Sequence, residues 1–331
     1  MRFARLRVVL ILLGVVAVLA GAYVIASRIE DSQYVEPRGG IVTESTLQTR
    51  EYQGRTYVRK SGLHTLLVIG VDDTEEDAAG YVGYRNNSQA DFLLLIVVDA
   101  TDRQVHRLLI NRNTMAEIVV LGILGREIGT QKAQITLAHG FGKTEEERSK
   151  HTVQAVQNLL EGETIDHYVS FLMDSMQKLN HAVGGVEITL EDDDLAVLDP
   201  TMVKGAHLTL TDDQAALLIR SRMLVGDGLN ASRMNRQRMF LDALVQTVRK
   251  KGNKDVSFVN RLSDDLYAMC TTDANRATLN NLFNLSFSYD ILPVETLAGE
   301  YTYGSDGFEE FYTDESAIIS WVLETLYRPQ T

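Results

Sequence analysis

The chain has 331 residues, 45% of them hydrophobic and 23% charged, which is enough apolar sequence to bury the core of one large domain. Its 45 acidic and 32 basic residues give a formal net charge of −13, and this argues against non-specific nucleic-acid binding, which needs a broad positive potential. The single cysteine, Cys270, excludes an intramolecular disulfide framework and any zinc site built from cysteines.

The N-terminal residues 1–28 predict a cytoplasmic tip and a membrane anchor. Three arginines within the first seven residues precede an uncharged run over 8–27, and twenty helical residues span roughly the 30 Å of a hydrocarbon core. Because basic flanks stay in the cytoplasm, we expect a single-pass protein in the cell membrane with its N-terminus inside and its C-terminus outside. A cleaved signal peptide is the alternative, because small residues occur at 20–22. In both cases the working domain is extracytoplasmic.

The rest of the chain divides into a tether and one domain. Residues 29–60 are polar, include Pro37-Arg38-Gly39-Gly40 and have little periodicity, so they predict an extracytoplasmic stalk. Residues 61–331 form the domain, including a C-terminal extension. They contain no internal repeat and no low-complexity tract. We therefore expect one domain on a tether.

Apolar runs and helical patterns alternate along this domain. Strands are expected at 66–71, 92–98, 105–110, 168–173 and 186–190, and helices at 144–161, 174–183, 211–222, 232–250, 275–285 and 314–326. The continuous apolar runs are typical of strands covered on both faces, and the turn near Asp102 predicts a hairpin of the second and third strands. The expected fold is α/β, a central mixed β-sheet flanked by helices on both faces (an α-β-α sandwich).

Two carboxylates lie at the ends of the first two strands. Asp72 follows the first strand and Asp91 precedes the second, so both are expected at one edge of the sheet. Carboxylates brought together repel unless a cation lies between them, and hard oxygen ligands favour Mg²⁺, with Mn²⁺ possible. The alternative is that both are ordinary turn residues. Arg112, at the end of the third strand, can reach the same edge, and Lys132 lies in the loop region that follows.

Five arginines fall between residues 219 and 239, with no lysine and one acid. Arg220 and Arg222 precede Gly226-Asp227-Gly228, and Arg233 shares one helix face with Gln237, four positions later. Arginine favours planar, multidentate recognition of phosphate or carboxylate, so the cluster predicts an anion site; a solvated helix face is the alternative. Carboxylates, a metal and arginines around a diphosphate together match the physical requirements of phosphoryl transfer.

Six blocks of sequence, over roughly residues 63–250, resemble the LytR–CpsA–Psr family of membrane-anchored cell-wall proteins. The blocks are Leu67-Val68-Ile69-Gly70-Val71-Asp72, Gln89-Ala90-Asp91-Phe92-Leu93, Ile110-Asn111-Arg112-Asn113-Thr114-Met115, Val183-Gly184-Gly185-Val186, Arg220-Ser221-Arg222 with Gly226-Asp227, and Arg233-Met234-Asn235-Arg236-Gln237. Each block alone is weak, but six in order behind an N-terminal anchor are specific.

The resemblance implies transfer of a glycan-1-phosphate, of the teichoic acid or capsule type, from a polyprenyl pyrophosphate carrier to a peptidoglycan hydroxyl. Its implied partners are the lipid-linked glycan, the peptidoglycan acceptor and the membrane, with no nucleic acid. It further implies an apolar tunnel for the prenyl chain between the sheet and the helices. The implied site residues are Asp72 and Asp91 for Mg²⁺; Arg112, Arg220, Arg222, Arg233 and Gln237 for the pyrophosphate, with Lys132 as a further contact; and Arg112 and Asp91 for catalysis.

Two positions depart from the family pattern. Gln89 stands where the family usually has an arginine, for which Arg85 is a possible substitute, and Asn113 stands where the family has an aspartate. If that aspartate activates the acceptor hydroxyl, transfer is expected to be slow, and Asn113→Asp is expected to raise turnover. The alternatives to a transferase are therefore a lipid pyrophosphate hydrolase and a non-catalytic scaffold that binds polyprenyl phosphate. A transcriptional role is disfavoured by the expected location outside the cytoplasm.

Overall fold

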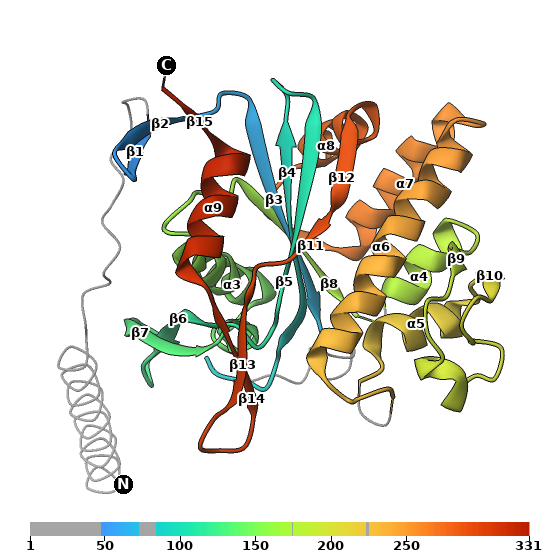
Figure 1. The fold of residues 1–331 in the computed structure, drawn as a ribbon, viewed down its shortest axis with the longest axis horizontal. Coiled ribbons are helices and arrows are strands. Elements are labelled where there is room, and N and C mark those ends of the chain that lie inside the picture. Colours follow the sequence, from blue (N-terminus) through green and yellow to red (C-terminus); the bar gives the residue numbers. More distant parts are fainter. Residues whose placement is uncertain (1–47, 73–83, 174, 223–224, 331) are drawn as a thin grey trace, which may run out of the picture.

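The computed structural model describes residues 48–72, 84–173, 175–222 and 225–330 (Figure 1). The apolar run expected to anchor the chain lies outside these ranges, as does the stalk up to residue 47. None of the helices within the described ranges has the length and apolar character that a membrane span requires.

A six-stranded mixed sheet forms the centre of the domain, as predicted. Its spatial order is β11-β8-β3-β4-β5-β12. The strands β3, β4 and β5 are antiparallel neighbours, whereas β8 runs parallel to β3 and β12 runs parallel to β5. The bounds are β3 Leu63–Val71, β4 Ala90–Asp99, β5 Gln104–Ile110, β8 His167–Leu172, β11 Thr271–Thr272 and β12 Asp290–Glu295.

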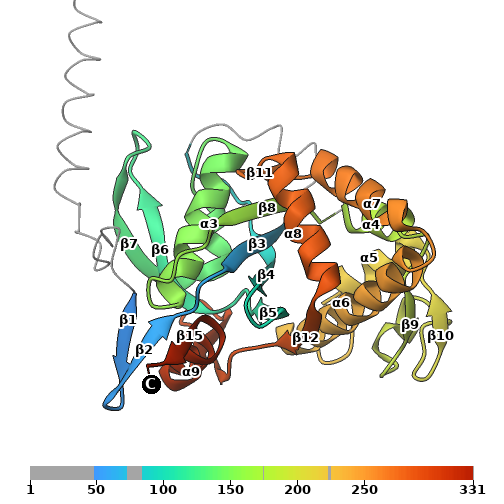
Figure 2. The ribbon, with the colours of Figure 1, turned by 90° about the horizontal axis from the view of Figure 1, so that it is seen from above.

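Helices cover both faces of this sheet (Figure 2). One face carries α3 (Glu145–Leu159) and α9 (Glu315–Leu326). The other carries α4 (Ser175–Ala182), α5 (Asp212–Arg220), α6 (Asn230–Gly252), α7 (Val256–Met269) and α8 (Arg276–Ser288). The expected central mixed sheet between two helical layers is confirmed.

Alternation along the central strands divides the interior into two cores. In β4, Leu93 and Leu95 pack with the residues of α3 and α9, whereas Phe92 and Leu94 pack with those of α4, α5 and α6. Successive side chains of a strand point to opposite faces, so a strand that is apolar at every position needs cover on both sides. The run of apolar residues in β4 therefore requires the two helical layers.

The hairpin expected between the second and third strands is present as β4 and β5, with Asp99 opposite Gln104. The buried Asp99 holds the turn, because its Oδ1 accepts hydrogen bonds from the amides of Thr101 and Asp102, each 2.9 Å long. Its Oδ2 pairs with Lys60 Nζ at 3.0 Å. This turn fixes the register of both strands, and so fixes where β4 begins and β5 ends.

Smaller sheets surround the centre. They are β1 Thr49–Tyr52, β2 Arg55–Arg59 and β15 Tyr327–Pro329; β6 Met115–Leu121 and β7 Glu127–Gln134; β9 Glu187–Thr189 and β10 His207–Thr209; and β13 Gly299–Tyr303 and β14 Glu309–Thr313. Two 3-10 helices are η1 Ile135–Gly140 and η2 Asp194–Val197. The strands β1 and β2 lie inside the range expected as a stalk, and they join the folded part by pairing with the C-terminal strand.

Candidate active site

The two predicted carboxylates lie at the same edge of the central sheet. Val71 of β3 is opposite Ala90 of β4, whereas Gly70 is opposite Phe92, so Asp91 is the extra residue of a β-bulge. The amide of Asp72, the residue after β3, donates to the carbonyl of Gln89 at 3.0 Å. Bulges bend a strand and re-aim side chains, and they are common beside active sites. The bulge is what presents Asp91 at this edge.

Two arginines hold Asp91 between them. Its Oδ1 lies 2.6 Å from NH1 of Arg112, which follows β5, and its Oδ2 accepts from NH1 of Arg233 in the first turn of α6 at 3.1 Å. Asp91 is only 7% exposed and Arg233 only 5%. Removing charged groups from water costs free energy, so a buried ion pair needs good geometry. Removing one partner leaves the other charges uncompensated. Asp91 is therefore the central charge of the cluster.

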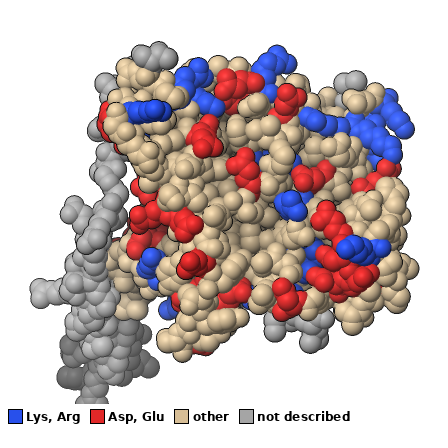
Figure 3. Space-filling view, in the orientation of Figure 1, with Lys and Arg blue, Asp and Glu red and all other residues tan. Residues whose placement is uncertain are grey.

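Two further arginines extend the site toward solvent. Arg220, at the end of α5, pairs with Asp72 at 2.8 Å, and Arg222 lies 3.8 Å from the buried Glu309 of β14. Burial lowers the pKa of Arg112; Asp91 raises it, and the positive charges of Arg233 and Arg222 lower it further. The charges thus act on one another as one unit. The clustering of arginines is local to this site: on the face shown in Figure 3, acidic side chains lie among the basic ones.

The arrangement has spare capacity for an anion. Within the described residues, the guanidinium groups of Arg112, Arg220, Arg222 and Arg233 gather around the carboxylates of Asp72, Asp91 and Glu309. The Nε atoms of Arg112, Arg222 and Arg233 are buried and have no hydrogen-bond partner among the described residues. Buried donors are nearly always satisfied, and guanidinium groups bond phosphate oxygens strongly. These buried donors, on three neighbouring arginines, fit a bound phosphate group.

A chain of buried asparagines supports these arginines. Asn230 Oδ1 accepts from Arg233 at 2.6 Å, and Asn230 Nδ2 donates to Asn111 Oδ1 at 2.7 Å. The same oxygen of Asn111 accepts from the amide of Asn113 at 2.9 Å. Sequence reasoning missed this network, although Asn111 and Asn113 flank Arg112 and Asn230 begins the arginine-bearing helix. The network fixes the orientation of the arginines before any ligand arrives.

Arg236 and Gln237 hold the segment that carries the outer arginines. Arg236 is 2% exposed, donates to the Ser221 carbonyl at 2.5 Å and pairs with Asp194 at 3.0 Å. Gln237, which was expected in the pyrophosphate clamp, donates to the Ile219 carbonyl at 3.2 Å. In this structure both side chains therefore hold residues 219–221 against α6. A role for Gln237 toward pyrophosphate stays a prediction.

The remaining candidates lie apart from the arginine cluster or have other partners. Lys132 belongs to β7, where a loop was expected, and its ammonium group lies 5.2 Å from the centre of the Tyr312 ring. The guanidinium group of Arg85 lies 5.5 Å from the Phe141 ring centre, and its substitution for an arginine at position 89 stays a prediction. Gln89 itself accepts a hydrogen bond from Arg112. The amide thus supports the site's central arginine.

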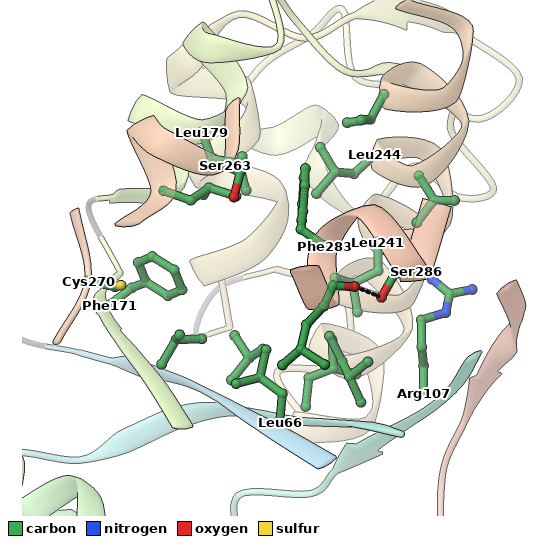
Figure 4. A pocket seen from close by; sticks show the side chains of 18 of the residues that line it. Leu66, Arg107, Phe171, Leu179, Leu241, Leu244, Ser263, Cys270, Phe283 and Ser286 are labelled. Atoms are coloured by element: carbon green, nitrogen blue, oxygen red, sulfur yellow. Dashed lines mark hydrogen bonds between the residues drawn. The ribbon is translucent and has the colours of Figure 1, made fainter. Parts of the chain in front are cut away.

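An apolar cavity of about 260 Å³ adjoins this site. It lies between the sheet and the helices α4, α6, α7 and α8, and side chains such as Leu66, Phe171, Leu244 and Phe283 line it (Figure 4). Ile219 and Gln237 also line it, and these two residues belong to the helices that carry Arg220 and Arg233. The helices α5 and α6 therefore contribute both to the arginine cluster and to the apolar cavity.

Asp72 and Asp91 are the candidate ligands for a divalent cation. Asp72 and Asp91 are each engaged by arginine, yet a carboxylate has about four lone-pair positions, so each retains acceptor capacity. Within the described ranges, no three or more His, Cys, Asp or Glu side chains gather in a way that could hold a metal ion. Mg²⁺, however, is commonly held by one or two carboxylates with substrate phosphates and water supplying the rest. The residues fit a cation that binds together with a diphosphate.

The sequence of the chain matches the model of the LytR_cpsA_psr family over residues 38–318. The chain belongs to this family. The matched range contains every element of the site described above, from the bulge at Asp91 to the hairpin that carries Glu309. The resemblance stated from the six sequence blocks is thereby confirmed.

Relatives within the family are moderately similar to this chain. The chain is 30% identical over 184 residues to a polyisoprenyl-teichoic acid–peptidoglycan teichoic acid transferase, TagU, of Halalkalibacterium halodurans, covering 55% of this chain and 52% of the relative. The match thus spans about half of the relative's length. Among solved structures, Bacillus subtilis TagV has a TM-score of 0.59 at 19% identity, covering 81% of this chain and 98% of TagV. A structure of TagT bound to LI-WTA has a TM-score of 0.60 at 16% identity, covering 80% and 90%. These two structures share the fold.

Proposed function

We propose that this chain transfers a glycan-1-phosphate polymer, of the teichoic acid or capsule type, from a polyprenyl pyrophosphate carrier to a hydroxyl group of peptidoglycan. One observation carries the proposal: Phe92, Ile219 and Gln237 line the apolar cavity, and they lie next to Asp91, next to Arg220 and one helical turn from Arg233. A ligand that suits both halves has an anionic head and a long apolar tail. A polyprenyl pyrophosphate has this composition.

The head group would be held by charge. Arg112, Arg222 and Arg233 each have a buried Nε–H donor that no described residue satisfies, and Arg220 adds a partly exposed guanidinium group. Charge-assisted bonds from fixed arginines become stronger as charge gathers on the phosphoryl oxygens, and this stabilises the transition state of phosphoryl transfer. Arg112 has the central role, since it touches Asp91 and acts electrostatically on the other members. Asp91 orients Arg112 and Arg233.

In the reaction, the acceptor hydroxyl oxygen attacks the phosphorus that bears the glycan. A phosphorus–oxygen bond forms to the acceptor, and the bond from that phosphorus to the lipid phosphate breaks. Polyprenyl phosphate leaves with the electron pair, the glycan becomes attached through a phosphodiester, and the hydroxyl proton passes to a base. A Mg²⁺ ion held by Asp72 and Asp91, or Mn²⁺ in its place, would neutralise part of the diphosphate charge.

Relatives and location support this assignment. The TagU relative is named as a teichoic acid transferase that acts on peptidoglycan, and one structural neighbour was solved with LI-WTA bound. A peptidoglycan acceptor requires the site to be outside the cytoplasm, which agrees with the anchor expected at residues 1–28. We propose a single-pass membrane protein with an extracytoplasmic domain.

A single-turnover assay tests the proposed function. The purified protein is mixed with a synthetic polyprenyl pyrophosphate-linked saccharide, with and without peptidoglycan fragments, and both products are followed. The transferase predicts polyprenyl phosphate release together with saccharide attached to the fragments. Release without attachment in the presence of acceptor would indicate a lipid pyrophosphate hydrolase. Binding with no release would indicate a scaffold.

A further inference from the structure

The C-terminal hairpin of β13 and β14 brings a carboxylate into the site from a distant part of the sequence. Glu309, the first residue of β14, is 7% exposed. Its Oε2 accepts a hydrogen bond of 2.6 Å from Nδ2 of Asn113, the residue that follows Arg112, and it lies 3.8 Å from NH2 of Arg222. The carboxylate therefore touches two segments that build the anion site.

Several contacts besides the Glu309 side chain attach the hairpin to the domain. The Phe311 amide donates to the Asn113 carbonyl at 2.9 Å, and the Gln134 side chain donates to the Glu309 carbonyl at 2.7 Å. Phe311 also forms a parallel bridge with Thr114. These contacts do not depend on which side chain stands at position 309. The hairpin therefore has attachments that a substitution of the Glu309 side chain would leave in place.

The surroundings of Glu309 compensate its charge incompletely. Among the described residues, its side-chain partners are a neutral amide at 2.6 Å and a guanidinium nitrogen at 3.8 Å, whereas Asp91 has guanidinium nitrogens at 2.6 and 3.1 Å. Burying a carboxylate is costly unless it is well paired. The negative charge is nevertheless felt nearby, because burial and then the charge of Glu309 raise the pKa of Tyr301 on the facing strand. The carboxylate thus keeps acceptor positions free for a hydroxyl group placed beside Asn113.

A groove leads along the same face of the hairpin. Side chains of residues 309 and 311 share one face of β14, and Tyr301, opposite Phe311, shares the corresponding face of β13. Tyr301 and Phe311 line a groove of about 400 Å³ with Asn111, Asn235 and Arg238. Its mixture of aromatic, amide and guanidinium groups suits a saccharide, which needs both stacking surface and hydrogen bonds. The groove reaches Asn111 and Thr114, on either side of the Asn113 that contacts Glu309, so an acceptor bound there would lie near this carboxylate.

We propose that Glu309 is the general base of the transfer reaction, supplied by the C-terminal hairpin to the position beside Asn113. The inference rests on the proposed function. The acceptor hydroxyl gives its proton to the Glu309 carboxylate as its oxygen bonds to phosphorus, and the proton is released to solvent after polyprenyl phosphate has left. The amide of Asn113 orients the carboxylate, and Arg222 bridges it to the bound phosphate.

The structure revises the expectation that Asn113→Asp alone raises turnover. An aspartate at that position would face Glu309 at hydrogen-bond distance, and two carboxylates so close repel each other. The single variant is therefore expected to be slower than the wild type. The double variant Asn113→Asp/Glu309→Gln exchanges amide and carboxylate across the same contact, so it restores one base and one amide.

The test uses four variants of the full chain in the single-turnover assay: Glu309→Gln, Asn113→Asp, their combination, and Glu310→Gln. Glu310 is the matched control, because it lies on the opposite face of the hairpin, where it accepts from the Tyr312 hydroxyl at 2.9 Å. We expect Glu309→Gln to slow transfer by about 10²–10⁴-fold, which is the usual range for loss of a general base. Affinity for the lipid pyrophosphate should change less than threefold, and the double variant should regain at least tenfold over Glu309→Gln.

The outcomes separate the inference from the proposed function. Wild-type transfer with an equally fast Glu309→Gln variant would overturn the role of Glu309 and leave the transferase intact. A Glu309→Gln variant that loses lipid binding in proportion to turnover, with no recovery in the double variant, would make Glu309 structural. No transfer by the wild-type protein would overturn both proposals.

Discussion

At the scale of single residues, the site depends on which carboxylates pair with which arginines and amides. Residue types and strand ends were sufficient to predict that Asp72, Asp91 and Arg112 meet at one sheet edge. The pairing of Asp91 with Arg233, 142 residues away, could not be predicted because it depends on how α6 packs on the sheet. Glu309 was missed for the same reason, since 196 residues separate it from Asn113. A glutamate on a short polar strand such as β14 has no sequence pattern that would mark it as a site residue.

The arginine clamp makes a prediction for Arg222→Ala. This guanidinium group is partly exposed, pairs with Glu309 only at 3.8 Å and has an unused Nε–H donor, so its removal should disturb the fold little. A charge-assisted hydrogen bond contributes roughly 1.5–3 kcal/mol, so affinity for polyprenyl pyrophosphate should fall about tenfold or more. Equilibrium binding to a soluble short-chain analogue measures it. Arg261→Ala, on the exposed Arg261–Asp255 pair of α7, is the control, and equal affinities in both variants would make the cluster a solvated surface.

The metal prediction is best tested at Asp72. Its ion pair with Arg220 is exposed, and such pairs contribute at most about 1 kcal/mol, so Asp72→Asn should fold normally. Asp91→Ala is a poorer probe, because it leaves two buried guanidinium groups unpaired and should cost about 3–5 kcal/mol of stability. We expect wild-type turnover to depend on Mg²⁺ and Asp72→Asn to require a higher Mg²⁺ concentration. Equal wild-type activity in EDTA and in Mg²⁺ would show that the carboxylates serve only the arginines.

At the scale of elements, periodicity located most of the central architecture. Each of the five expected strands and six expected helices has a counterpart, with ends that differ by a few residues. The helix α7 was missed although Val259, Leu262 and Leu266 repeat at helical spacing, so its signal was present. The hairpins β6–β7 and β13–β14 had no such signal, because their strands are polar at many positions and gain their order by packing on the domain.

The contacts of Glu145 in α3 predict that the stability of the fold decreases in acid. Burial of Glu145 raises its pKa, but hydrogen bonds and charge from His139, a hydrogen bond from Ser170 and the charge of Arg148 outweigh burial and hold the pKa at about 2. A depressed carboxyl pKa contributes stability that is present above the unfolded value of 4.5 and is lost as pH falls toward 2. Lowering the pKa of Glu145 from 4.5 to about 2 corresponds to about 3 kcal/mol of folding stability at neutral pH.

Urea unfolding at several pH values measures this contribution. The wild type should lose stability steeply between pH 4.5 and pH 2, whereas Glu145→Gln should be less stable at pH 7 and show a shallower loss in that window. The neighbouring exposed Glu146→Gln should behave like the wild type. Parallel curves for Glu145→Gln and the wild type would contradict the prediction.

At the scale of the whole molecule, the two faces of the sheet are used differently. The face under α3 and α9 is packed with large side chains such as Trp321, whereas the apolar cavity lies on the face under α4, α6, α7 and α8. The arginine cluster lies at the sheet edge that bounds this second face. The sequence predicted an apolar tunnel only through family resemblance. A cavity depends on how the helices pack, and the residues that line it have the same apolar spacing as residues of a filled core.

The orientation in the membrane is a prediction at this scale. The basic flank and uncharged run at residues 1–28 predict an N-in, C-out protein. Protease added to intact protoplasts should remove a C-terminal epitope tag while a cytoplasmic marker protein survives. Full protection of the tag until the membrane is permeabilised would place the domain inside and contradict a role on peptidoglycan.

The central claim is that one amphiphile occupies the arginine cluster and the apolar cavity together, and mass spectrometry of lipid that co-purifies with the protein tests it most directly. The account predicts a polyprenyl phosphate or pyrophosphate on the wild type. Much less should remain on Arg222→Ala, which weakens the head site, and on Leu244→Trp, which fills the cavity. Val197→Trp, at a 70% exposed position on η2, should retain it. Absence of any prenyl lipid from the wild type, or equal amounts on all four proteins, would contradict the account.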